Sequence, residues 1–486
     1  MSLAQRVAAN TLIQFIGRVV STVTALVVVA SLTRYLGVSA YGDYTTIFAY
    51  VSFFGVLADF GFFWIMLREI SKEKANEAKI ISNVLTLRTI FGILVFLIGF
   101  LIALLIPQYT ETIKLGIGVI AFAWLWLALN STFVGVFQRH LRMDQAVLTD
   151  LLGRVVILLG VLWVIANQGD LIDILWMYVF GNGLNFLASL VLGRNFVRVQ
   201  PKFDLAFWSQ IIREAWPMGI VLILHVVYFK IDTVMLSLMQ SSVDVGIYGA
   251  PYKILEVLLT IPAMFLGNVF PTLTQYLASQ DERLPRLYQQ AFDVLALIAF
   301  PLILGTVILA QPILEFVAGA EYVTTSTITW LSLPATGATA LQILIIAVGI
   351  SFFSQFFNYL LIAMGRQRSL ILPNLIFVIL NVGLNFGMIP ILSYIGASLT
   401  TVATELAVAL LLGWIVWRAA KLRPAFCSLG KIVLSTLGMG VVTWWLREAP
   451  LALNLSASII TYGYLSILTG ALPQNMLSLI LKKKEV

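Results

Sequence analysis

The chain has 486 residues, of which 60% are hydrophobic and only 11% are charged, with a formal net charge of +7. A soluble chain of this length would need about twice that share of charged residues to cover several domains. One cysteine and two histidines exclude a disulfide framework and a Cys/His zinc site, and they leave little material for His-based catalysis. Basic residues lie in short segments between apolar ones, so the net charge does not indicate a nucleic-acid partner.

Long runs without any charged residue decide the structural class. Five of them cover 115–138, 257–280, 322–365, 369–404 and 449–481. About 20 apolar residues suffice for a membrane-spanning helix. Strands of alternating hydrophobicity are not seen in the sequence, which argues against a membrane β-barrel. The sequence therefore predicts an all-α polytopic membrane protein.

Fourteen spans are predicted. They are 10–33, 43–66, 80–106, 115–137, 146–166, 172–193, 215–239, 246–271, 290–312, 340–364, 369–392, 397–417, 431–446 and 453–472. If the N-terminus is cytoplasmic, cytoplasmic segments hold 22 of the 30 basic residues and external segments hold three. This asymmetry follows the positive-inside rule, so both termini are expected in the cytoplasm.

A short internal repeat suggests how the spans are grouped. Gly42-Asp43-Tyr44 follows the first span, and Gly246-Ile247-Tyr248 follows the seventh, at an offset of about 204 residues. An even number of spans per repeat predicts two six-helix lobes in parallel order, related by pseudo-two-fold symmetry. The expected domains are therefore 1–205, 206–425 and 426–486. The last one comprises two extra helices and a basic tail.

Three stretches give the chain a family resemblance. They are 32–44 (LTRYLGVSAYGDY) with 68–71 (REIS), 230–236 (KIDTVML) with 246–248 (GIY), and 381–390 (NVGLNFGMIP) with 395–398 (IGAS) and Glu405. Together they resemble polysaccharide (O-antigen) flippases of the Wzx type, whose superfamily also includes drug exporters and the lipid II flippase.

The resemblance implies a function and a location. It implies translocation of an undecaprenyl-pyrophosphate-linked oligosaccharide from the cytoplasmic to the outer leaflet of the bacterial inner membrane. It also implies a central cavity between two lobes and alternating access coupled to H⁺ or Na⁺, without an enzymatic step, a metal or another cofactor. Membrane lipids and the polymerase and chain-length proteins of the same pathway are the further partners it suggests.

Five basic residues lie inside predicted spans, where each needs a partner or a cavity. Arg18, Arg88 and Arg154 each lie about eight residues into a span from the cytoplasmic end, so they are expected at one depth as a cationic ring. Lys230 and Lys253 lie in the second lobe. Arginine suits bidentate phosphate recognition, which makes these five residues candidates for binding the pyrophosphate.

Each of these basic residues also has a structural interpretation. Asp150 and Arg154 are four residues apart and can pair on one helix face. Lys253 can pair with Glu256, three residues away. Asp59 is predicted at the depth of Arg18 and can neutralise it. Arg88 has no acid within four positions on its own helix, which makes it the strongest single candidate.

Acids and amides complete the set of polar residues inside the spans. Four acids are candidates for ion coupling: Asp59, Asp232, Glu256 and Glu405. Amides that share a helix face either join helices or line a cavity: Asn374, Asn381 and Asn385, and likewise Asn182 and Asn185. Trp124 and Trp126 point to different faces of one span, so either of them can stack on a sugar or pack in the core.

Two other functions remain possible on the sequence alone. A small-molecule exporter of the same superfamily would bind cations and should carry more acids than bases inside its spans. A membrane glycosyltransferase or polymerase acting on the same lipid needs an external domain with catalytic acids. The longest external segment, about 313–339, carries only Glu315 and Glu321. The identity of the sugar, the envelope polymer and the oligomeric state are open.

Overall fold

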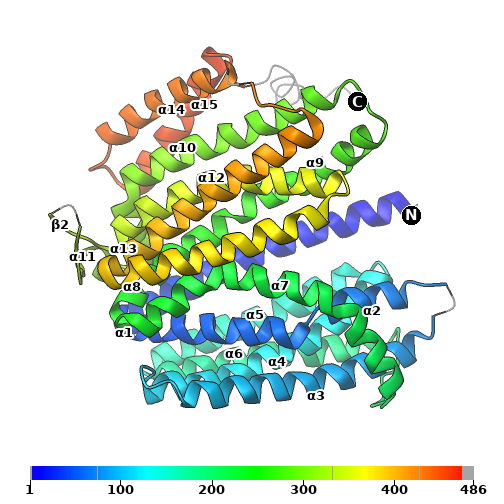
Figure 1. The fold of residues 1–486 in the computed structure, drawn as a ribbon. Coiled ribbons are helices and arrows are strands. Elements are labelled where there is room, and N and C mark those ends of the chain that lie inside the picture. Colours follow the sequence, from blue (N-terminus) through cyan, green and yellow to red (C-terminus); the bar gives the residue numbers. More distant parts are fainter. Residues whose placement is uncertain (1–2, 74, 331, 426, 473–486) are drawn as a thin grey trace. The chain divides into compact units, whose positions relative to one another are not determined.

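Helices make up nearly all of the regular structure, so the predicted all-α class is confirmed. The computed structural model describes residues 3–73, 75–330, 332–425 and 427–472. The chain divides by internal contacts into two compact units, Met1–Gly246 and Ile247–Val486 (Figure 1). Each unit is a bundle of long apolar helices.

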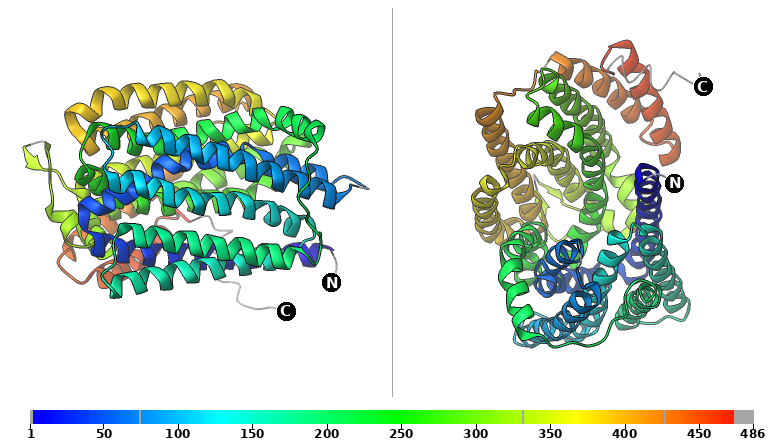
Figure 2. Two further views of the ribbon diagram at one scale, coloured as in Figure 1. Left: turned by 90° about the horizontal axis from the view of Figure 1, so that it is seen from below. Right: turned by 90° about the vertical axis from the view of Figure 1, so that its right-hand side faces the viewer.

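The first unit is built from seven helices within its described residues. They are α1 (Leu3–Asp59), α2 (Phe62–Ile70), α3 (Glu77–Leu104), α4 (Glu111–Arg139), α5 (Met143–Ala166), α6 (Leu171–Gly193) and α7 (Leu205–Met239). Helices α3 to α6 run alongside one another (Figure 2), and α1 packs on α4, α5 and α7. Every wall of the candidate site described below therefore comes from within this unit.

Polar N-caps fix where several of these helices begin. Asn76 accepts a hydrogen bond from the backbone N–H of Lys79 at 3.0 Å, and Asp170 forms a reciprocal capping box with Asp173. Asp204 does the same for α7 by accepting from the N–H of Phe207 at 3.1 Å. These side chains satisfy backbone donors that a helix start leaves unpaired, so the boundaries are set locally by sequence.

Left-handed backbone positions divide the long first helix. Gly37 has φ 68°, and the turn after Asp59 uses Phe60 at φ 41° and Gly61 at φ 80°. Glycine adopts such angles without the steric cost that a Cβ imposes. The bend at Gly37 separates the first two predicted spans, and the turn at Phe60–Gly61 ends α1 beside the carboxylate of Asp59.

The outer faces of the first unit are suited to lipid. On α3, Gly92, Phe96 and Gly99 are buried, whereas Leu94 and Ile98 are about half exposed, at 51% and 53%. A helix that is apolar on all sides and packed on only one of them is typical of a lipid-facing span. The chain is a multi-pass membrane protein.

The second unit begins within α8 (Ser242–Leu258). Its other elements are α9 (Thr260–Ala278), α10 (Leu284–Ala318), α11 (Glu321–Thr324), β1 (Thr329–Trp330), β2 (Leu333–Pro334), α12 (Gly337–Ala363), the 3-10 helix η1 (Gln367–Leu370), α13 (Ile371–Ala420), α14 (Cys427–Trp445) and α15 (Leu451–Leu468). The two short strands form an antiparallel hairpin in which Thr329 faces Pro334 and Trp330 faces Leu333. Helix α13 breaks at Ser393, which has φ 46°.

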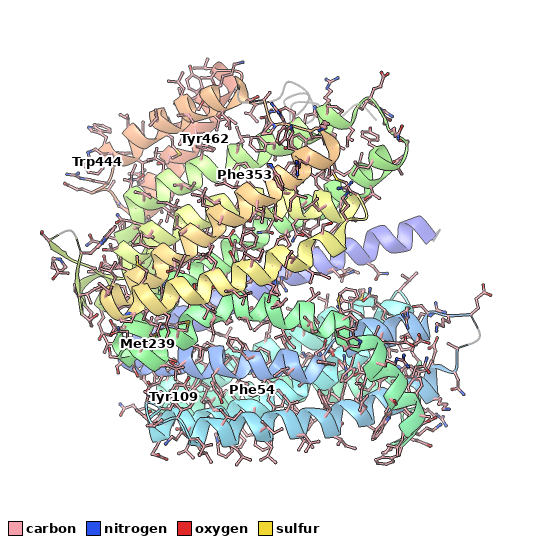
Figure 3. The ribbon with its side chains drawn as sticks, in the orientation of Figure 1. Phe54, Tyr109, Met239, Phe353, Trp444 and Tyr462 are labelled. Carbon is pink, nitrogen blue, oxygen red and sulfur yellow. The ribbon has the colours of Figure 1, made fainter. Side chains whose placement is uncertain are left out.

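Polar contacts join the last two helices to each other and to α10. Tyr462 of α15 donates a hydrogen bond to the carbonyl of Leu297 on α10 at 2.8 Å (Figure 3). Thr443 of α14 and Ser458 of α15 are hydrogen bonded at 2.8 Å, and Asn454 donates to the carbonyl of Thr443 at 2.9 Å. Hydroxyl and amide pairs of this kind join helices in apolar surroundings.

The span count and the lobe boundaries stay predictions. In the described residues, eleven helical segments are long and apolar enough to cross a membrane. Two of them, Ile13–Ile70 and Ile371–Ala420, have 58 and 50 residues, more than twice the length of one crossing. The compact units separate at Gly246, later than the predicted boundary at 205, because α7 packs on α1 and α2.

The two glycines of the internal repeat lie in close backbone contact within the first unit. A Cβ added to Gly42 would lie 1.8 Å from the carbonyl oxygen of Ser242, and one added to Gly246 would lie 2.0 Å from that of Val38. Nearby, Ser242 donates a hydrogen bond to Asp43 at 2.5 Å. Both glycines are therefore required by packing, which gives the repeated motif a local physical reason.

Candidate functional site

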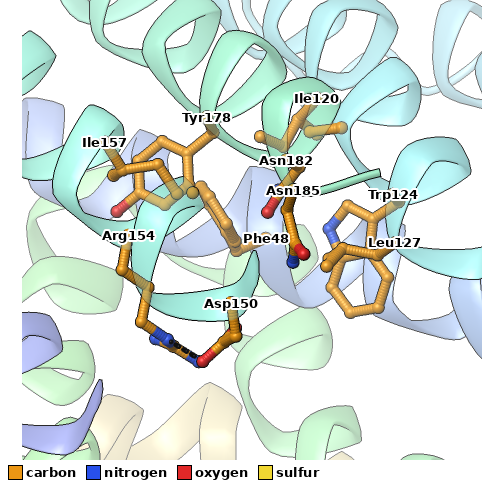
Figure 4. Close-up of a pocket in the computed structure, with 12 residues that line it drawn as sticks. Phe48, Ile120, Trp124, Leu127, Asp150, Arg154, Ile157, Tyr178, Asn182 and Asn185 are labelled. Carbon is orange, nitrogen blue, oxygen red and sulfur yellow. Dashed lines mark hydrogen bonds and ion pairs between the residues drawn. The ribbon is translucent and has the colours of Figure 1, made fainter. Parts of the chain in front are cut away.

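A cavity of about 180 Å³ lies between α1, α4, α5 and α6 of the first unit (Figure 4). We call it the first-unit cavity. Its wall combines aromatic rings, amides and one ion pair: Phe48, Trp124, Asp150, Arg154, Tyr178, Asn182 and Asn185. A concave site with aromatic walls and a few polar groups is the usual form of a small-ligand site.

Close approach of the helices shapes this cavity. A Cβ on Gly153 of α5 would lie 2.7 Å from the carbonyl oxygen of Gly181 on α6. A Cβ on Gly55 of α1 would lie only 2.2 Å from the indole carbon Cε3 of Trp124. The glycines thus let two backbones meet on one side and seat an indole ring against bare backbone on another.

Asp150 and Arg154 form the ion pair at the cavity, as their i, i+4 spacing predicts. The Nε of Arg154 donates to the Oδ2 of Asp150 at 2.8 Å, and the hydroxyl of Ser21 on α1 donates to the same oxygen at 2.8 Å. The two side chains are 34% and 40% exposed. In the part of the chain that the structure describes, the Nη groups of Arg154 have no hydrogen-bond partner. They are therefore available to an anion.

Arg88 has the opposite environment. Its side chain is 0% exposed, and its Nη2 donates to Asp59 at 2.5 Å. Its Nη1 donates to the carbonyl of Ala128 and the hydroxyl of Thr132, both at 3.0 Å, and to the hydroxyl of Ser131. The guanidinium therefore joins α3 to α4 and to the turn that ends α1. A ligand has no open surface on it in this structure.

The neutralising partner of Asp59 differs from the expected one. The alternative that Asp59 pairs with Arg18 is wrong, because Arg88 of the adjacent α3 holds that carboxylate. Arg18 is exposed on α1, and among the described residues its side chain has no hydrogen-bond or ion-pair partner; its backbone carbonyl accepts a hydrogen bond from the hydroxyl of Thr22 at 2.8 Å. Arg18, Arg88 and Arg154 thus share no partner among the described residues. Equal depth along a helix does not fix the direction in which a side chain points.

The remaining basic candidates and two of the acids lie on α7 and α8. Lys253 and Glu256 form an ion pair at 2.7 Å, with 40% and 26% of the side chains exposed, so their spacing again predicts the pair. Lys230 is partly buried on α7, and Asp232 on the same helix is 2% exposed. Although each is paired with an acid, Lys253 with Glu256 and Arg154 with Asp150, both basic side chains remain partly exposed.

Glu405 is a buried acid held by a neutral partner. It lies on the second part of α13 with 6% of its surface exposed, and it accepts a hydrogen bond from the hydroxyl of Ser354 on α12 at 3.0 Å. Sequence reasoning selected Glu405 and missed Ser354. Serine is too common in helices to be distinguished without its neighbour across the helix interface.

The asparagines of α13 contact one another. The Nδ2 of Asn385 donates to the Oδ1 of Asn381 at 3.1 Å, and both residues are at most 1% exposed, whereas Asn374 is partly buried. In the first unit, Asn182 and Asn185 line the cavity. The same type of spacing therefore marks an amide pair on α13 and a cavity wall on α6.

Trp124 and Trp126 lie on different faces of α4 and have different surroundings. Trp124 lines the cavity, whereas Trp126 stacks on Phe186 with ring centroids 5.2 Å apart. Sequence reasoning missed Tyr178 and Phe48 as lining residues. Tyr178 had a detectable signal, because positions 178, 182 and 185 follow the i, i+4, i+7 spacing of one helix face.

Family models and a curated relative match this chain in sequence. The model described as "Polysaccharide biosynthesis protein" matches residues 7–277, and the MatE model matches residues 217–387. "Probable flippase AglR" of Haloferax volcanii is 22% identical over 252 residues. The match covers 49% of each chain, so this chain aligns with about half the length of that relative.

Solved structures share the fold over most of the chain. The lipid II flippase MurJ in an inward closed conformation has a TM-score of 0.77 at 15% identity, covering 94% of this chain and 98% of MurJ. An inward-facing multidrug resistance MATE family transporter of the MOP superfamily has a TM-score of 0.63 at 14% identity, with 82% and 94% covered. At sequence identities of 15% and 14%, these similarities establish a shared fold and nothing about the substrate.

Proposed function

Because this chain belongs to the polysaccharide biosynthesis protein family, we propose that it is a flippase for an undecaprenyl-pyrophosphate-linked oligosaccharide. It moves this lipid from the cytoplasmic to the outer leaflet of the bacterial inner membrane, with both chain termini in the cytoplasm. The polymerase and chain-length proteins that use the product are its expected pathway partners.

One observation supports a lipid-linked oligosaccharide as the substrate class. Arg154 stands at a cavity lined by amides and aromatic rings, and its Nη groups are not used by the described residues around it. A guanidinium with two open Nη groups suits the oxygens of a phosphate, because it donates two parallel hydrogen bonds. Amides and aromatic rings suit sugar hydroxyls and ring faces. A lipid-linked oligosaccharide carries both chemistries on one molecule.

The other basic residues take separate parts in this proposal. Arg18 is exposed and Lys253 is partly exposed, so each offers a further contact to the pyrophosphate, and Lys230 on α7 is a third. Arg88 holds the end of α1 through Asp59 and acts on transport by positioning that helix. The asparagines of α13, Asn374, Asn381 and Asn385, are proposed to face the translocated sugars during part of the cycle.

Ion coupling is proposed at Glu405. Asp59 and Glu256 each pair with a basic residue, and Asp232 is buried on α7. Glu405 is buried and accepts a hydrogen bond from the hydroxyl of Ser354, a group that can rotate as the carboxyl gains or loses a proton or binds Na⁺. Transport in proteoliposomes under a pH gradient or a Na⁺ gradient tests this. Glu405→Gln should abolish the response to one gradient, and an unchanged response would exclude Glu405.

Transport itself is tested with purified protein in liposomes that contain a fluorescently labelled lipid-linked oligosaccharide. Wild type should expose the label to an external quencher faster than protein-free liposomes do. Arg154→Gln should lose most of this rate, while Arg142→Gln, at an exposed cytoplasmic position, is the matched control. Native mass spectrometry of protein extracted from its own membrane should show the carrier lipid with sugars. If only phospholipid binds and cationic dyes are transported, the protein is a small-molecule exporter.

A further inference from the structure

One wall of the first-unit cavity carries a polar atom that the fold leaves unpaired. Asn185 of α6 is 3% exposed, and its Oδ1 has no hydrogen-bond partner in the structure. It lines the cavity beside Asn182, one turn earlier on the same helix (Figure 4). A buried carbonyl oxygen without a donor is unfavourable. The oxygen is itself fully buried, so a ligand in the cavity supplies its donor only when the amide of Asn185 turns toward the cavity.

Another lining residue of the cavity offers an aromatic ring. Trp124 of α4 is held against the bare backbone of Gly55, and the neighbouring Trp126 is already used in packing on Phe186. Asn182 and Asn185 lie between Trp124 and Tyr178 in the close-up view (Figure 4). A ligand in this space meets an aromatic face, amide groups that both donate and accept, and an ion pair at Asp150 and Arg154.

The volume limits the size of the ligand. About 180 Å³ corresponds to roughly six water molecules, and it lies below the roughly 300 Å³ at which pockets for drug-sized molecules begin. A single six-membered ring with several hydroxyl groups fits this space. The cavity is open on one side, so the rest of a larger ligand would lie outside it.

We propose that the first-unit cavity is a subsite for one sugar ring. Trp124 packs against the face of the ring, and Asn182 and Asn185 exchange hydrogen bonds with its hydroxyl groups. Arg154 stays at the edge, where the pyrophosphate is bound. The choice of a sugar rests on the proposed function, because that lipid brings a sugar next to a phosphate. Asn182, Asn185 and Trp124 are therefore specificity-determining residues for the first sugars of the repeat unit.

Binding of free sugars tests the subsite without any transport step. Full-length protein in lipid nanodiscs is mixed with methyl α-D-glucopyranoside, methyl α-D-galactopyranoside or N-acetyl-D-glucosamine, and saturation-transfer NMR is recorded. At least one sugar should receive saturation on its ring protons. Asn185→Leu should weaken that binding roughly tenfold, the effect of one lost hydrogen bond of about 1.4 kcal/mol. Trp124→Leu should remove the ring-current shift of the bound sugar protons.

Asn130→Leu is the matched control. Asn130 of α4 is also buried, at 7% exposure, and its Oδ1 is also unpaired, but it is not among the residues that line the cavity. Asn130→Leu should leave sugar binding unchanged. Thermal unfolding separates ligand binding from structural support: Asn185→Leu should keep or raise the melting temperature while it loses the sugar. A lower melting temperature with unchanged sugar affinity would overturn the assignment of Asn185.

The outcomes distinguish the subsite from the flippase activity. If wild type moves the lipid-linked oligosaccharide but no free sugar is saturated, and Asn185→Leu transports at the wild-type rate, the subsite is refuted and the flippase stands. If wild type binds a sugar in an Asn185-dependent way but does not move the lipid, the subsite stands and the flippase is refuted. If cationic dyes displace the bound sugar and are themselves saturated more strongly, the cavity is a cation site and the proposal fails.

Discussion

Arg88 on α3 and Arg154 on α5 begin from similar positions along their helices and reach opposite environments. Arg88 is fully enclosed, with Asp59 and three oxygens of α4 around its guanidinium. Arg154 is 34% exposed at a cavity, with one nitrogen on Asp150. The enclosed arginine has its charge balanced by the protein in a low-dielectric site. The exposed arginine has donors left for a ligand.

The difference assigns separate tasks to the two arginines. A buried ion pair is costly to disrupt, because removing one partner strands the other in a medium that cannot solvate it. A half-exposed pair contributes little to stability, because water screens it and competes for it. Substitution of Arg88 should therefore lower stability more than substitution of Arg154 does. Substitution of Arg154 should reduce transport at little cost in stability.

The largest effect on stability is expected at the enclosed pair. Arg88→Ala should lower the free energy of unfolding by about 3 kcal/mol, because the fully buried Arg88 is lost and Asp59, which is 26% exposed, loses its partner. The double variant Arg88→Met with Asp59→Leu should recover much of that loss. Thermal unfolding in detergent measures both. An unchanged melting temperature in Arg88→Ala would contradict the structural role and restore Arg88 as a phosphate ligand.

Gly55→Ala should produce an intermediate effect confined to the first-unit cavity. The added methyl group would overlap the indole of Trp124, and overpacking of this kind costs roughly 1–3 kcal/mol. The indole must shift, so sugar binding should fall as well. Gly267→Ala is the control, because a Cβ there meets nothing within 4 Å. Equal behaviour of the two variants would show that the indole moves freely.

Arg154→Gln should change stability by only about 0–1 kcal/mol, while transport falls by at least roughly tenfold through the lost charge-assisted hydrogen bonds. Exchanging the two residues, as Asp150→Arg with Arg154→Asp, keeps the pair but reverses its geometry. Transport should stay low if Arg154 binds phosphate. Restored transport in the exchanged variant would mean that the pair is only structural.

The smallest effect is expected for an exposed pair at the start of α7. Lys79 lies 2.8 Å from Asp204, and its hydrogen bond holds the pKa of that carboxyl below the ordinary 3.8. The resulting stabilisation is present above pH 3.8 and is lost as the pH falls through the lowered pKa. The melting temperature of Asp204→Asn should thus be slightly lower than that of wild type at neutral pH, and the two melting temperatures should become equal in acid. A pH series of melting temperatures checks this.

Much of the architecture was predictable from local sequence. Charge-free runs predicted the apolar helices. Asn76, Asp170 and Asp204 are a local signal that the predicted spans did not use, although an N-cap needs only its own first turn. The i, i+4 pair Asp150–Arg154 and the i, i+3 pair Lys253–Glu256 were predictable for the same reason. The partner of Arg88 was not predictable, because Asp59 lies on another helix.

By itself, the sequence determined the class of the protein, its helical elements and the types of polar residue placed in the membrane. Composition and periodicity are properties of a single helix, so they can be determined without knowing which helices are its neighbours. Only the tertiary structure decided which arginine is enclosed and which one faces a cavity, and that Trp124 lines this cavity while Trp126 packs in the core. Those outcomes depend on which helix lies against which face, and neighbouring helices such as α4 and α6 are distant in sequence.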